Sequence, residues 1–136
     1  MTATPAPGSF RQEAFDNGIV LEFFDQSNRY FGDYHRLRVL VEIRLPLTPT
    51  LFLQEPDPAA ARDRAAALVG EVLVETRVLE RMGVPGAEVE AVQSRLVEDF
   101  LASAGLYLGR PDFPARLLAG RLTPAGGRRL PGTPYQ

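Results

Sequence analysis

The residues best suited to chemistry in this chain lie in and around one short segment, QSNRYFGDY, which follows Asp25 and ends just before His35. His35 is the only histidine of the 136 residues, and Asp33 stands two positions before it. A carboxylate that holds an imidazole can orient it as a general base, so Asp25 and His35 form half of such a unit. The same two side chains would also satisfy each other as polar groups where a loop leaves a sheet, and we favour this structural interpretation.

A divalent metal site is a second use for Asp25, Asp33 and His35, because histidine and carboxylate ligands suit several such ions. Their spacing follows no recurring ligand set, and carboxylates in loops commonly turn the chain by bonding nearby backbone. The chain contains no cysteine, which excludes thiolate ligands, and no lysine, which excludes a phosphate-binding loop of the GxxxxGK type. We therefore expect no catalytic residue, metal or other cofactor.

Aromatic and basic side chains make the same segment a candidate interaction loop. Rings beside arginines are typical of protein-contact hot spots and of platforms that stack single-stranded nucleic acid, and rings in a loop also fold back to cap a core. The net charge of −2 makes nucleic acid the weakest of these three interpretations. The candidate loop comprises Arg29, Tyr30, Phe31, Asp33, Tyr34 and His35.

Two strands are expected to position this loop as an N-terminal antiparallel hairpin. Residues 35–45 alternate between apolar and polar with a period of two, which is typical of a half-buried strand, and residues 18–24 supply its partner. One register joins the apolar faces of both strands and also sets opposite charges across them. This register pairs Phe23 with Leu37, Leu21 with Val39, Glu22 with Arg38 and Asp25 with His35.

The outward face of this hairpin is less polar than a solvated sheet face should be. Val20, Phe24 and Leu40 would cluster there, so either the third helix or another chain must cover them. An exposed edge strand is a second route to association, because its unpaired backbone groups can pair with a copy of itself. We therefore take Val20, Phe24 and Leu40 as the candidate oligomer surface, and expect a homo-oligomer or a protein partner.

The remainder of the chain predicts one further strand and three helices. Residues 70–82, GEVLVETRVLERM, fit either a helix or a strand, and Gly70 together with the β-branched residues favours the strand. Asp57 and Pro58 are typical of a helix start, and apolar residues recur with helical spacing from Gly86 to about Leu108. The predicted helices cover about 58–69, 86–108 and 113–122. The fold class is therefore α+β, an N-terminal antiparallel β-hairpin, extended to a three-stranded sheet, packed by two or three helices.

Length and composition indicate one globular domain, residues 10–122, between flexible tails at 1–9 and 123–136. The second tail is rich in proline, glycine and arginine, and the whole stretch from Arg110 onward carries five arginines against Asp112 alone. No segment is long and apolar enough to span a membrane, and the start of the chain lacks the pattern of a secretory signal. These features predict a cytoplasmic protein without membrane contact.

Two strings of the sequence resemble small bacterial proteins of uncharacterised function. They are FFDQSNRYFGDYHR (23–36) and LERMGVPGAEVEAV (79–92), and the resemblance extends over most of residues 16–122. It implies a compact bacterial α+β domain and carries no catalytic residues to transfer. The leading hypothesis is a non-enzymatic self-associating or protein-interaction domain. The alternatives are a small-molecule or metal-dependent enzyme with its site at the hairpin loop and, third, single-stranded nucleic-acid binding through the Arg/Tyr loop.

Overall fold

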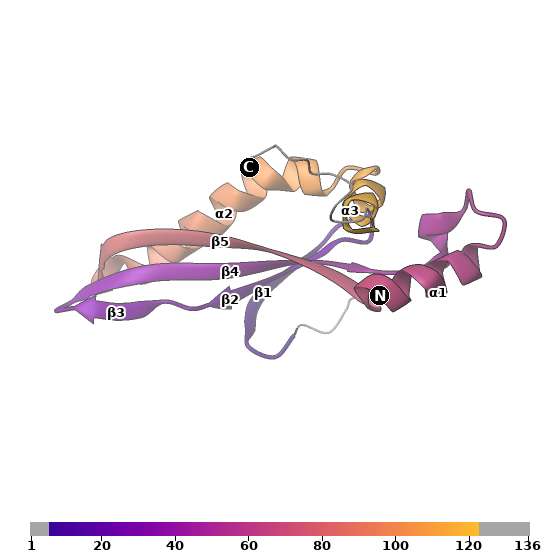
Figure 1. Cartoon of the computed structure of the whole chain (residues 1–136). Coiled ribbons are helices and arrows are strands. Elements are labelled where there is room, and N and C mark those ends of the chain that lie inside the picture. Colours follow the sequence, from indigo (N-terminus) through magenta and orange to yellow (C-terminus); the bar gives the residue numbers. More distant parts are fainter. Residues whose placement is uncertain (1–5, 123–136) are drawn as a thin grey trace, which may run out of the picture.

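A long central strand, β4 (Tyr34–Pro46), organises the fold (Figure 1). One edge of β4 pairs with β2 (Val20–Asp25) and then with β3 (Asn28–Phe31), while its other edge pairs with β5 (Val72–Pro85). β1 (Ser9–Ala14) pairs with β2 and completes an antiparallel sheet of five strands. This computed structural model describes residues 6–122.

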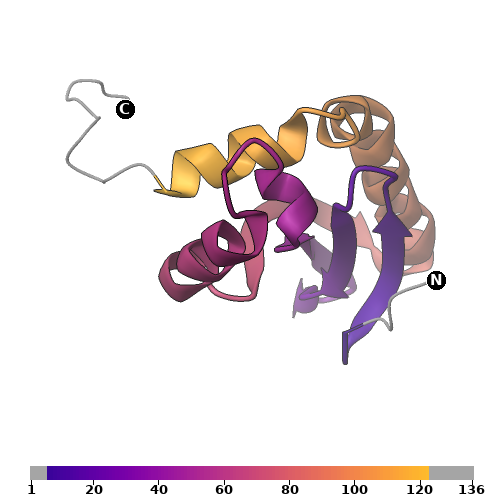
Figure 2. The same ribbon diagram turned by 90° about the vertical axis from the view of Figure 1, so that its right-hand side faces the viewer.

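Helices cover one face and one end of the sheet. α2 lies along the face, and α1 and α3 gather at the end where β5 begins (Figures 1 and 2). The side chain of Asp57 caps α1 by accepting a hydrogen bond from Ala60 N at 3.2 Å, as the Asp-Pro start predicts. The helical segments are η1 (Pro49–Phe52), α1 (Pro58–Val69), η2 (Gly86–Glu88), α2 (Val89–Leu108) and α3 (Phe113–Leu122).

The core lies between the helices and the odd-numbered residues of β2 and β4, a surface that we call the inner face. Leu21, Phe23, Val39 and Val41 on this face are fully buried, and Phe100 of α2 packs edge-on against Phe23 with ring centroids 6.3 Å apart. The alternation in the sequence therefore predicts the correct buried face of both strands. The even-numbered residues form the opposite, outer face, which no helix of the described chain covers (Figure 1).

The predicted register between the first two strands is wrong by four residues. Phe23 pairs with Val41 rather than Leu37, and Glu22 pairs with Glu42 rather than Arg38. The reason is that the predicted loop contains a strand of its own: β3 pairs with the start of β4 around a two-residue turn at Gly32 and Asp33. An even-numbered shift keeps every side chain on its predicted face, so the core was unaffected by the error.

The prediction of an α+β fold is confirmed, with more strands than expected. Residues 70–82 do contain the strand that was favoured over a helix, and it runs to Pro85 as β5. β1 was not predicted at all, because its sequence SFRQEA is short and mostly polar. The predicted tail at 123–136 lies outside the described residues. Within 6–122, none of the helices has the length and hydropathy to cross a membrane.

Candidate functional site

The candidate interaction loop forms a projecting hairpin tip at the end of the sheet farthest from α1 and α3 (Figure 1). Three of its aromatic rings are exposed: Phe31 at 72%, Tyr30 at 48% and Tyr34 at 47%. Arg29 and His35 are strand partners within this tip. The expectation that some of these rings cap the core is therefore not met, and the tip presents them outward instead.

Asp33 has a structural partner in the connection between β5 and α2. The backbone N–H of Gly86 lies 3.1 Å from Asp33 Oδ2 and 3.0 Å from the Asp33 carbonyl oxygen, so both atoms accept from it. A Cβ at position 86 would lie too close to Asp33 Oδ1, so any larger residue there requires the Asp33 carboxylate to move. Asp33 thus fastens the hairpin tip to the start of α2.

Asp25 and His35 do not face each other. Asp25 pairs with Val39, four positions along β4, and its carboxylate accepts from Ser27 N at 2.9 Å. Burial raises the pKa of Asp25, but hydrogen bonds from Ser27 and Gln93 outweigh it and hold that pKa below its usual value. This corrects the predicted register at the open end of the hairpin. In the part of the chain that the structure describes, no three carboxylate or histidine groups gather as metal ligands would.

The candidate oligomer surface lies on the outer face, where cross-strand rows can be followed. Phe24 is opposite Leu40, which is opposite Val78 of β5; Val20 starts a parallel row through Arg44 to Val74. All five apolar side chains are partly or largely exposed, Val78 at 42%. The third helix, α3, does not cover them, because its Phe113 and Leu118 belong to the core on the inner face.

A polar row separates the two apolar rows. Glu22 is only 2% exposed, and its Oε2 accepts from Gln12 Nε2 at 2.7 Å. Its second oxygen, Oε1, has no hydrogen-bond partner among residues 6–122. The directly opposite residue is Glu42, whose carboxylate is 2.5 Å from Arg44. The predicted ion pair of Glu22 with Arg38 is therefore absent, and one oxygen of the buried Glu22 carboxyl group has no partner in the described chain.

Arg36 and Arg38 on the outer face pair instead with β5. Arg36 Nε is 2.6 Å and Arg38 Nη1 3.5 Å from Glu80 Oε2, across the β4–β5 ladder. The hydrogen bond from Arg36 holds the pKa of Glu80 below its usual value. These contacts join the two longest strands near the hairpin tip.

The free edge of β5 is the surface that residue spacing alone did not locate. Leu47 N donates to Glu71 O, so odd-numbered residues of β5 point their backbone groups at β4 and even-numbered ones point them away. In agreement, Arg121 Nη2 donates to the outward-pointing Val74 O at 2.9 Å. Thr76, Val78 and Glu80 are exposed along this edge. The sequence signal was the general rule that sheet edges pair, which does not say which strand is the edge.

These surfaces are arranged for contact with other molecules: an aromatic tip, a partly apolar sheet face and a long open strand edge. Comparison of the chain with family models, with curated proteins and with solved structures finds no match.

Proposed function

We propose that this protein is a non-enzymatic, self-associating domain, and that a second copy pairs with it antiparallel along the free edge of β5. The observation that carries the proposal is the sequence of β5, which complements itself when reversed about Thr76. Main-chain hydrogen bonds of this kind give affinity, and the side chains beside them select the register. The resemblance of residues 16–122 to small bacterial proteins supports a bacterial source, and we propose the cytoplasm as its setting.

Backbone geometry permits the register centred on Thr76. In an antiparallel pair, two opposed residues exchange hydrogen bonds only if both point their backbone groups at each other. Even-numbered residues of β5 point outward, and this register opposes even to even: Thr76 to Thr76, and Val74 to Val78 of the second copy. The new ladder would leave the hydrogen bonds between β4 and β5 intact, while Arg121 and Arg77, which donate to Val74 O and Thr76 O, would have to share or release these two oxygens.

Side chains favour the same register on both faces of the sheet. On the inner face, Glu75 would lie opposite Arg77 of the second copy, and Leu73 opposite Leu79. On the outer face, Val74 opposite Val78 would continue the apolar row from Phe24 and Leu40 into the neighbouring molecule. Opposite charges and matched apolar pairs directly across a ladder are each stabilising.

Other two-fold registers along this edge are poorer. Centring the pair on Val78 would oppose Arg77 to Leu79 and Thr76 to Glu80, and centring it on Glu80 would oppose that carboxylate to itself. Charged residues on an edge strand often prevent pairing. In the register centred on Thr76, Glu75 instead lies opposite Arg77 of the second copy, so these two charges favour this register over the others.

Sedimentation velocity of the full chain over a concentration series tests the proposal. Thr76→Pro removes an N–H that points away from β4, so the β4–β5 ladder stays intact while the central bonds of the new ladder are lost. We expect the unchanged chain and the control Thr76→Val to dimerise, and Thr76→Pro to be monomeric with an unchanged far-UV CD spectrum. A chain that remains monomeric at every concentration, or a dimer that Thr76→Pro leaves intact, would refute pairing through β5.

A charge exchange tests the register independently of proline. Glu75→Arg should weaken the dimer, because it places two guanidinium groups opposite each other, and adding Arg77→Glu should restore it. A double variant no tighter than the single one would show that these residues do not face each other. Because Glu75 also pairs with Arg77 and Arg121 within one chain, far-UV CD and urea unfolding of both variants must first show that the monomer is still folded.

The exposed hairpin tip supports a second candidate function, single-stranded nucleic-acid binding. Its carrying observation is that Tyr30, Phe31 and Tyr34 present their rings to solvent beside Arg29. Fluorescence anisotropy with a labelled thymidine oligonucleotide is the test. Binding that weakens with salt and is lost in Phe31→Ser would support it, and no binding at low salt would reject it and leave the tip as a protein-contact surface.

A further inference from the structure

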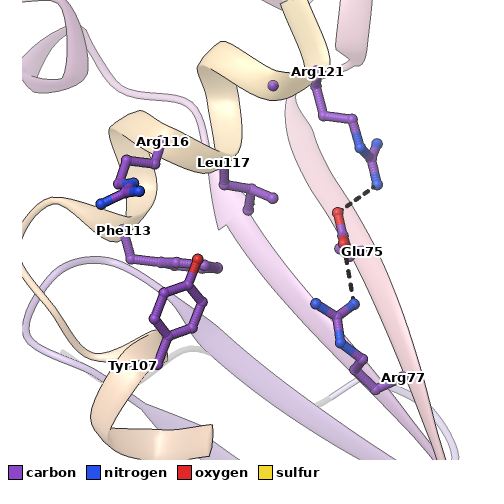
Figure 3. A pocket seen from close by; sticks show the side chains of 8 residues that line it. Glu75, Arg77, Tyr107, Phe113, Arg116, Leu117 and Arg121 are labelled. Atoms are coloured by element: carbon purple, nitrogen blue, oxygen red, sulfur yellow. Dashed lines mark hydrogen bonds and ion pairs between the residues drawn. The ribbon is translucent and has the colours of Figure 1, made fainter. Parts of the chain in front are cut away.

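A pocket of about 420 Å³ opens between the inner face of β5, the end of α2 and the helix α3 (Figure 3). It is separate from the hairpin tip and from the outer face, and no prediction from the sequence included it. Its two sides differ in chemistry: Arg77, Glu75 and Arg121 line one side, and Tyr107, Phe113 and Leu117 line the other (Figure 3).

The charged side of the pocket carries a cation in excess. Arg77 Nη1 and Arg121 Nη2 approach Glu75 from opposite directions, each 3.1 Å from one of its oxygens (Figure 3). The single negative charge of Glu75 is therefore shared by two positively charged guanidinium groups. Glu75 is also the least exposed of the three side chains, at 30% against 47% and 42% for the arginines. The charge that this side presents to an incoming ligand is positive.

A further arginine adds to the positive potential. Arg116 lies on the rim of the pocket and points away from Glu75 (Figure 3). Its only ion pair in the described chain is a contact of 3.4 Å with Asp112, a carboxylate that Arg110 shares at the same distance. Three arginines and one carboxylate line the pocket in total, which favours anions by electrostatic attraction.

The opposite side offers a rigid apolar wall. Phe113 is 5% exposed, and the ring of Tyr107 packs edge-on against it with centroids 5.0 Å apart. Tyr107 itself is 51% exposed, so one part of its ring remains free for contact. Leu117 extends this wall towards Glu75 (Figure 3). A flat hydrophobic body fits such a surface better than a hydrated ion does.

We propose that this pocket binds a small aromatic anion, with a carboxylate or phosphate group held by Arg77 and Arg121 and its ring against Tyr107 and Leu117. Arginine suits this role because its planar group of N–H donors matches the oxygens of both head groups. Each guanidinium group gives Glu75 one side-chain hydrogen bond and keeps further donors for the ligand. The volume is that of a site for a single-ring compound.

Titration of the ¹⁵N-labelled full chain with phenyl phosphate tests the site, with the amide of the pocket-lining Gly120 as reporter. We expect a saturable shift of this signal, and an affinity about tenfold weaker in Arg121→Gln, which is the usual effect of losing one charge-assisted hydrogen bond. Arg95→Gln on the exposed side of α2 is the matched control, with the same change of charge and no expected effect.

Three further ligands separate the contribution of the anionic group to binding from that of the ring. Phenol lacks the anion and inorganic phosphate lacks the ring, so each should bind more weakly than phenyl phosphate; benzoate reports whether a carboxylate is accepted as well. Equal binding of phenol or of inorganic phosphate, or an unchanged affinity in Arg121→Gln, would overturn the proposal. Glu75 and Arg77 belong both to this pocket and to the proposed β5 interface. The titration is therefore repeated on Thr76→Pro, which is expected to be monomeric: saturable binding there supports the pocket independently of the pairing of β5, and its absence would overturn the pocket.

Discussion

Replacing Glu22 by glutamine should stabilise this protein, although it removes a carboxylate from a strand that is paired on both sides. Glu22 is 2% exposed, Oε1 lacks a partner in the described structure, and Glu42 stands directly opposite. Leaving a buried charged acceptor unpaired costs about 2 kcal/mol, and a like charge across the ladder adds about 0.5 kcal/mol. The bond from Gln12 would weaken by about 1 kcal/mol once its acceptor is neutral. The amide NH2 that replaces Oε1 would be a buried donor, which costs about 1 kcal/mol even when the Glu42 carboxylate opposite accepts one of its hydrogens, so the net expectation is a gain of up to about 1 kcal/mol in the free energy of unfolding.

Urea unfolding followed by far-UV CD measures this change, and the slope of free energy against urea should stay the same. Two protein concentrations are needed, because self-association raises the apparent stability of any folded chain. The matched control is Glu42→Gln, which removes a carboxylate from the same row but breaks an ion pair with Arg44; it should lose up to about 1 kcal/mol. A Glu22→Gln variant that is less stable than the unchanged chain at equal slope would refute the reasoning.

Three other changes probe the remaining parts of the fold. Gly86→Ala should cost about 1 kcal/mol, because its Cβ displaces the Asp33 carboxylate and breaks its hydrogen bond with Gly86 N, and Asp33→Ala should remove most of that cost in a double-mutant cycle by urea unfolding. Asp25→Ala should lower the free energy of unfolding by at most about 1 kcal/mol above about pH 4, because the hydrogen bonds from Ser27 hold the pKa of Asp25 in the folded chain below its usual value. In urea titrations, this difference between the variant and the unchanged chain should vanish as the pH falls through the lowered pKa. Phe23→Ala should cost about 3–5 kcal/mol by thermal and urea unfolding, since its ring is fully buried; a loss under 1 kcal/mol would contradict its place in the core.

The faces of the strands could be predicted from the sequence, and the partners of the strands could not. The alternation from Leu37 to Leu45 depends only on the chain's own pleat, so it identified the buried side correctly. The register depends on what the intervening residues do. Asn28–Phe31 carries polar and aromatic residues that suit a loop as well as a strand, and its pairing with β4 displaced β2 by four positions.

The candidate sites show the same limit. The tip residues are contiguous in sequence, so their exposure together could be anticipated from Tyr30 to His35. The pocket combines Glu75, Tyr107 and Arg121, which come from three elements that only tertiary packing brings together. The excess of arginines after Arg110 was the one available signal, and it gave no indication of an apolar wall opposite them.

The position of β4 between two neighbours also determines the order in which this chain folds. β3 and β4 are joined by two residues and can close as a local hairpin, whereas β5 reaches β4 only after η1 and α1 have been made. Closing the shorter loop costs less entropy, so the hairpin of β3 and β4 should form first. Until β5 is added, the edge of β4 that pairs with β5 in the folded chain remains unpaired. That intermediate exposes the strand with the most buried residues of the described sheet to other unfolded chains. The yield of refolding should therefore fall with protein concentration, and synthesis of α1 and β5 sets the period during which a nascent chain is open to aggregation.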